Sequence, residues 1–479
     1  MATGTTWLHS GRRFGKQLLR SLDDAAFREL CRFVRKRESK NSGSRKHAGI
    51  QVQKLHRRRD LRGRQIAVRR RQKWQMRQSI LLTALCPERD RRWRVAGRTR
   101  KRLEIDLQNF SFLDNPAETT RALCRLAGAE TQYENVRLNF CDEHMLDIGP
   151  YLVLGLMGQS MVPFVTGGKL PVTTRRAIEA TDLTEFLDII PLRMPGDGQR
   201  IVPFRLQRRG SVLQTDRNIT ANPSTKEKVT TELVQAVRVW LESSGAELTD
   251  DGEKALSSLC NEILENGERH ARPGDGGDWA VAGLMERREQ RGHSDPGTNA
   301  DLVCNFAFVS IGLTIPETIF YTESPTVKSD LTRYCALHRS HALPDSVLAT
   351  LFAAQDGMTR KRYPPATPGG LGLMSAVEAV AGLTDDAEGS HNSSLTIISG
   401  PACIQFKGQF LNVYNASDSD ARRFQWLNVS QSPREAPNRD AAFALPVDFP
   451  GTIITARFVL RGDAVSRGDA LGEQKRRSW

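Results

Sequence analysis

The sequence has no pair of cysteines at a spacing typical of metal binding or redox chemistry. Its eight cysteines lie far apart and none belongs to a C-x-x-C pair, which excludes a zinc ribbon and provides no disulfide framework. Several lie in apolar runs, where a free thiol behaves as a small hydrophobic side chain. We therefore expect a cytoplasmic protein in a reducing environment.

The chain also lacks a long uninterrupted hydrophobic run. The longest, residues 151–165, is broken by two glycines, Gln159 and Ser160, and is shorter than the roughly 20 residues that a membrane span needs. The first residues lack the apolar segment of a signal peptide. The sequence predicts no membrane segment.

Charge is distributed unevenly along the 479 residues, which are enough for two or three domains. Residues 1–101 contain 30 Lys and Arg against 7 Asp and Glu, a net charge of +23, whereas the rest carries 39 against 48, a net charge of −9. This basic head includes an amphipathic helix expected over 16–37. The head could bind nucleic acid through phosphates, bind an acidic protein or form a solvated arm, and no base-reading motif accompanies the charge.

Alternating strand and helix patterns begin after the head and predict an α/β fold. In the first unit, residues 102–206, we expect strands at 103–107, 136–140, 162–172 and 200–206 and helices at 116–128 and 148–157. Residues 207–225 are polar and indicate a linker.

A second unit is expected over 226–462, followed by a tail, 463–479. Its predicted helices are 229–243, 253–270 and 371–383, and its predicted strands are 279–285, 303–311, 394–399, 402–407, 409–414 and 452–460. A charged loop is expected at 286–300.

The predicted helix 253–270 carries a polar stripe. Glu262, Asn266 and His270 are four residues apart and share one side, opposite an apolar side. A carboxylate one turn from an amide can hold a divalent cation and orient a water for attack. The alternative is an ordinary solvated helix face.

Three further motifs follow this helix. The buried strand through Val309 and Ser310 runs into Gly312 and Thr314. The run from Thr367 to Leu373 contains Gly369, Gly370 and Gly372 at the start of a helix, where backbone N–H groups suit phosphate oxygens. Thr452 lies on the last predicted strand.

The order and spacing of these motifs resemble the Bergerat-fold (GHKL) ATPases, which include gyrase B, heat-shock chaperones and histidine kinases. Glu262-Ile-Leu-Glu-Asn266 matches the N box, and His270 is most similar to the anti-sigma-factor kinase branch. The resemblance implies an α+β two-layer sandwich over about 226–460 that binds ATP.

By this resemblance Asn266 would hold Mg²⁺ and Glu262 would act as general base. Gly369, Gly370 and Gly372 would lie beneath the phosphates, with 317–368 as an ATP lid and Thr452 near the adenine. His270, Gly312 and Thr314 would complete the nucleotide site, and a homodimer is left open.

The sequence departs from the family pattern at two positions. Ser310 stands where the family has an Asp that accepts a hydrogen bond from adenine, and Thr314 replaces a glycine. A hydroxyl forms weaker hydrogen bonds than a carboxylate, so a pocket that no longer binds ATP is the alternative. No phospho-acceptor His box is present, and His338 and His341 are expected at the surface.

Residues 102–195 resemble STAS domains, the partners of anti-sigma-factor kinases. The strand 136–140 followed by Asp147, Ile148 and a helix matches the STAS phosphorylation element, with Ile148 in place of the phosphorylated Ser. A generic βαβ unit is the alternative.

Three functions remain open. The first is a Mg-ATP-dependent conformational switch with ATPase activity, in regulation or defence. The second is a protein kinase of the anti-sigma type, in which Glu262 would activate a Ser or Thr hydroxyl. The third is a non-catalytic scaffold with a degenerate pocket and a nucleic-acid-binding head. The residues at the metal and base positions favour the switch.

Overall fold

The structure is a computed structural model that describes residues 31–36, 52, 79–89, 102–161, 164–183, 201–209, 225–243, 246–270, 278–289, 300–358, 372–384, 393–417, 420–460 and 465–467. The chain divides into two units, Met1–Gln75 and Met76–Trp479. In the first unit a helical stretch at 31–36 is described, so most of the predicted helix 16–37 and of the arginine-rich run lies outside the described residues. The second unit carries the fold.

A parallel three-stranded sheet is the first part of this unit. Strands β1 (Leu103–Leu107), β2 (Val136–Phe140) and β3 (Val165–Lys169) lie side by side in that order. Parallel neighbours require crossover connections, which contain α5 (Pro116–Ala127), η2 (Ala129–Thr131) and α6 (Gly149–Met161), and α7 (Val172–Ala180) follows β3. These elements confirm the predicted strands at 103–107 and 136–140 and both helices of this region.

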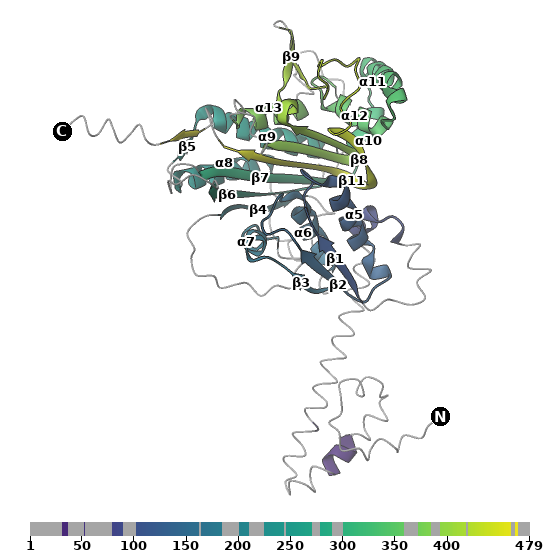
Figure 1. The fold of residues 1–479 in the computed structure, drawn as a ribbon, viewed down its shortest axis with the longest axis vertical. Coiled ribbons are helices and arrows are strands. Elements are labelled where there is room, and N and C mark those ends of the chain that lie inside the picture. Colours follow the sequence, from purple (N-terminus) through teal and green to yellow (C-terminus); the bar gives the residue numbers. More distant parts are fainter. Residues whose placement is uncertain are drawn as a thin grey trace, which may run out of the picture. The chain divides into compact units, whose positions relative to one another are not determined.

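An antiparallel five-stranded sheet is the second part (Figure 1). Its order is β4 (Ile201–Arg209), β6 (Trp279–Glu289), β7 (Ala300–Ile311), β11 (Ala442–Val459) and β8 (Ser394–Lys407). The predicted mixed α/β character is thus confirmed. However, β4 was predicted as part of the α/β unit 102–206. It pairs instead with β6, so 102–206 is not a self-contained domain.

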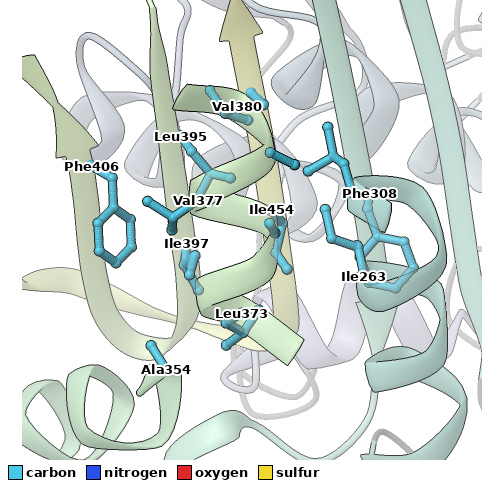
Figure 2. Packing of buried hydrophobic residues seen from close by; sticks show 14 of the residues in the cluster. Ile263, Phe308, Ala354, Leu373, Val377, Val380, Leu395, Ile397, Phe406 and Ile454 are labelled. Carbon is cyan, nitrogen blue, oxygen red and sulfur yellow. The ribbon is translucent and has the colours of Figure 1, made fainter. Parts of the chain in front are cut away.

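Helices cover one face of the five-stranded sheet. They are α8 (Lys226–Ser243), α9 (Asp250–His270), α10 (Ile315–Phe320), α11 (Pro325–His338), α12 (Asp345–Ala354) and α13 (Gly372–Gly382). Figure 2 shows Val377 of α13 beside Ile397 of β8, and Ile263 of α9 beside Phe308 of β7. A Cβ atom at Gly267 would lie 2.5 Å from Phe308 Cζ, so this glycine allows α9 to approach the sheet.

The opposite face of the same sheet packs against the parallel unit. One continuous core joins residues of β1, β2 and α6 to alternate residues of β6 and β7, among them Ala280, Ala282, Ala307 and Val309. Because both faces are covered, β7 is buried along nearly its whole length. The helices and the five-stranded sheet thus form the two layers that were expected, and the parallel unit covers the remaining face of the sheet.

The last part of the predicted basic head belongs to this body. Helix α3 (Ile80–Leu85) packs in the shared core through Leu81, Leu82 and Leu85. Arg89 is 1% exposed, and its Nε donates to Glu130 over 2.7 Å. The body therefore starts before residue 101.

Other predictions for residues 226–479 need correction. Residues 408–411 form a 3₁₀ turn, η5 (Gly408–Leu411), where a strand was expected at 409–414. The strands 394–399 and 402–407 are one strand, β8, which continues through Gly400 at φ 57°. The tail includes β12 (Val465–Arg467), which pairs with β5 (Ala246–Leu248), and an additional hairpin is formed by β9 (Tyr414–Ser417) and β10 (Asp420–Phe424).

The predicted lid, 317–368, is largely a packed helical segment. Helix α12 is part of the hydrophobic core, and Val347, Leu348 and Leu351 are completely buried. His338, expected at the surface, is 1% exposed, and its Nε2 lies 2.9 Å from the carbonyl oxygen of Pro433. Helix α12 and His338 are thus packed in the core, and 359–368 lie outside the described residues. The described helices include none long and apolar enough to cross a membrane.

Candidate functional site

Helix α9 presents a polar side at the position that the sequence predicts. Leu259, Ile263 and Leu264 are completely buried, whereas Glu262 and Asn266 are half-buried. The two polar residues are one turn apart on one side of the helix. His270 is the last residue of α9, and its side chain lies outside the described part of the chain.

Glu262 is surrounded by charges of both signs. Burial is the largest influence and raises the pKa of its carboxyl; Glu265 and Asp356 raise this pKa further, whereas Arg269 and Arg423 lower it. A carboxylate with a raised pKa is a stronger base near neutral pH than an ordinary glutamate.

One polar atom of the Asn266 side chain is buried. Its Nδ2 is shielded from solvent and forms no hydrogen bond to any described residue. Because the nitrogen and oxygen of an amide are assigned from their partners, either end of this group can occupy the unpaired position. An amide oxygen is a suitable ligand for Mg²⁺, so Asn266 fits the predicted metal contact.

Hydroxyl groups line one end of the five-stranded sheet on its helix-covered face. Ser310 of β7 lies directly opposite Thr452 of β11, and Thr452 is opposite Ser399 of β8. The Thr452 Oγ1 and Ser399 Oγ atoms are 2.8 Å apart, and the Ser399 Oγ accepts a hydrogen bond from Ile315 N over 2.7 Å. The structure thus brings the two predicted adenine contacts, Ser310 and Thr452, together.

Ser399 was missed by the sequence analysis. It lies inside an apolar strand with no motif around it, and the strand register places it beside Thr452. This register joins strands more than fifty residues apart, so local sequence gives no signal for it.

The turn after β7 differs in part from the prediction. Gly312 has φ 148°, a conformation that side chains disfavour. Thr314 is the N-cap of α10: its Oγ1 accepts from Glu317 N, and the Glu317 carboxylate accepts from Thr314 N over 2.8 Å. This capping box explains a threonine at that position without a ligand, so the prediction that Thr314 contacts the cofactor gains no support.

The second glycine motif is described only at its end. Gly372 is the first residue of α13, and Gly369 and Gly370 lie outside the described residues. The described chain stops at Met358 and resumes at Gly372.

A charged cluster that the sequence analysis missed lies at these two ends. The Arg423 guanidinium of β10 bonds Asp356 through Nε over 2.7 Å, Ser375 through Nη2 over 2.7 Å and Glu378 through Nη1 over 2.5 Å. Asp356, α13 and Arg423 are far apart in sequence, so no local pattern identifies the cluster. Asp356 and Arg423 influence the pKa of Glu262, and α13, which carries Ser375 and Glu378, packs against α9.

The predicted STAS-like element, in which Ile148 replaces the phosphorylated Ser, lies in the core. Asp147 and Ile148 are completely buried. The Asp147 carboxylate accepts hydrogen bonds from Phe112 N over 2.7 Å, Gly149 N over 2.8 Å and Thr455 Oγ1 over 2.5 Å. Because Thr455 belongs to β11, Asp147 joins the parallel unit to the five-stranded sheet.

No protein family, curated protein or solved structure matches the chain. Among the described residues, no group of three or more His, Cys, Asp and Glu is arranged to hold a metal ion. Water and phosphate oxygens supply most of the ligands at a typical Mg²⁺ site, and the protein supplies one or two. A site at Asn266 is therefore compatible with this finding.

Proposed function

We propose that the five-stranded sheet and its helices bind ATP with Mg²⁺ and act as a nucleotide-dependent conformational switch of the GHKL type. The observation that carries this proposal is the buried Nδ2 of Asn266, which has no partner among the described residues and lies one turn from Glu262, whose pKa is raised. An amphipathic helix with only a structural role has no need of a buried amide without a partner.

In this proposal each residue has one task. Mg²⁺, held by the Asn266 amide oxygen, would neutralise charge on the phosphates. The Glu262 carboxylate would accept the proton of a water that attacks the terminal phosphorus, as the bond to the leaving oxygen of ADP breaks. Ser310 and Thr452 would contact the base with neutral hydroxyls, which discriminate less strongly than a carboxylate.

Calorimetric titration with Mg-ATP tests the binding step. The wild type should bind, and Asn266→Ala should weaken binding at least about tenfold because one metal ligand is lost. Asn261→Ala is a matched control, since Asn261 lies on the same helix as Asn266 and its Oδ1 accepts a bond from Thr230 Oγ1 of α8 over 2.7 Å. A wild type that does not bind, or equal affinity of Asn266→Ala and wild type, would refute the proposal.

A hydrolysis assay separates the base from the binding residues. Glu262→Gln should still bind Mg-ATP but lose hydrolysis by about 10²-fold or more, the usual contribution of a general base. Glu253→Gln is the control, because Glu253 lies on the same helix, pairs with Arg238 of α8 and is not among the charges that shift the pKa of Glu262. Equal hydrolysis by Glu262→Gln and wild type would exclude Glu262 as the base.

A further inference from the structure

Arg423 links two parts of the chain that are separated by the segment 359–371. Asp356 precedes this segment, and Ser375 and Glu378 lie just after it on α13. Ser375 and Glu378 are three residues apart and therefore share one side of the helix. One guanidinium thus bonds both the start and the end of the segment that contains Gly369 and Gly370.

The start of the segment is aligned on β10 by several bonds. Asp356 N donates to Arg423 O over 3.1 Å, and Arg423 N donates back to Asp356 Oδ2 over 2.9 Å. One residue earlier in the chain, the Gln355 Oε1 accepts from Gln425 N over 2.8 Å, and Gln355 Nε2 donates to Gln425 O over 3.2 Å. Residues 355 and 356 are therefore fixed to the hairpin before the segment begins.

The charge balance favours a guanidinium at this position. The Asp356 side chain is fully buried and Arg423 is 16% exposed, so their ion pair is largely shielded from water. A planar guanidinium can bond three acceptors in different directions, which a lysine ammonium cannot do with the same fixed geometry. Removing it would leave the Asp356 carboxylate buried without its cation.

We infer that Arg423 is a positioning residue that sets the spacing between the two ends of the glycine-containing segment, one of which begins α13, the helix that packs against α9. The inference rests on the proposed function, in which that segment lies beneath the phosphates of ATP. Arg423 would affect binding through this spacing and not through contact with the nucleotide.

The bonds of Arg423 to Asp356, Ser375 and Glu378 are called the clamp below. Limited trypsin digestion measures how well the clamp restrains the segment between its ends. The segment contains Arg360, Lys361 and Arg362, so mass spectrometry can follow cleavage there in wild type and variants. Cleavage of Arg423→Met should be about tenfold faster than that of the wild type, because local opening becomes easier when its anchors are lost. Arg423→Lys should be intermediate.

Arg457→Met is the matched control. Arg457 is 15% exposed and its Nη1 bonds Asp114 over 3.2 Å on the opposite face of the sheet. It should be cleaved at 360–362 at the wild-type rate. A thermal melt shows whether each variant is folded; if Arg423→Met is not, the double variant Ser375→Ala, Glu378→Gln releases the α13 end while the Asp356–Arg423 pair remains.

Titration with Mg-ATP supplies the second measurement. Arg423→Met should bind about tenfold more weakly than wild type, and saturating Mg-ATP should slow its cleavage toward that of the bound wild type. If folded Arg423→Met, or the double variant used in its place, is cleaved at the same rate as the wild type, the clamp is overturned whatever the affinity for Mg-ATP. Faster cleavage together with a wild type that does not bind Mg-ATP overturns the proposed function and supports the clamp.

Discussion

Two buried aspartates in this protein have different surroundings. Asp147 joins the two sheets, and Asp356 lies at the start of the glycine-containing segment. Burial raises the pKa of both carboxyls. Three donors bond the Asp147 carboxylate and reach both of its oxygens, whereas Asp356 Oδ1 has no partner among the described residues.

This difference separates a structural acid from a candidate functional one. A buried carboxylate whose oxygens are all bonded stabilises one arrangement of the chain. A buried oxygen without a donor costs free energy that a ligand, a cation or a proton can recover. We therefore expect changes at Asp147 to reduce stability and changes at Asp356 to alter binding.

The largest expected effect is that of Asp147→Ala. The substitution leaves two backbone N–H groups and one hydroxyl buried without an acceptor, which should cost about 3–5 kcal/mol of unfolding free energy. Asp356→Ala should cost less than Asp147→Ala but weaken Mg-ATP binding. Urea denaturation and calorimetry of both variants measure the contrast, and equal losses of stability would remove it.

A pH series gives an intermediate effect. The pKa of Asp147 is raised above its ordinary value of 3.8 in the folded protein, so the folded state binds more protons than the unfolded state and stability falls as pH rises above that value. Asp147→Asn cannot titrate. The unfolding free energy of the wild type relative to Asp147→Asn should therefore decrease from pH 4 upward, and a constant difference would contradict the raised pKa.

The smallest effects should come from two threonines on opposite faces of β11. Thr455→Val removes one of the three donors to Asp147 and should cost about 1 kcal/mol of unfolding free energy without changing Mg-ATP affinity. Thr452→Val should weaken Mg-ATP binding and change stability less. A loss of nucleotide affinity in Thr455→Val equal to that in Thr452→Val would show that the two faces are not independent.

Local sequence patterns predict much of the secondary structure. The period-two alternation of 103–107 and the apolar stripe of α9 have strong local signals, and the structure confirms both elements. The half-buried positions of Glu262 and Asn266 follow from the same helical period.

The missed features depend on distant partners. The placement of β4 next to β6, the covering of the second sheet face and the bonds of Arg423 to Asp356 and Glu378 all join residues that are far apart in sequence. The burial of His338 likewise depends on a contact with Pro433, 95 positions away. No periodicity within one segment contains this information.

The core shared by the two sheets limits how this chain can be divided. Alternate residues of β6 and β7, including Ala282, Ala307 and Val309, are buried against the parallel unit. A fragment that begins at residue 226 would lack the edge strand β4 and expose this apolar surface to water, and large exposed patches of this kind promote aggregation. The two parts therefore cannot be exchanged as independent modules. Mutations on either side of their common core should change the stability of both parts together.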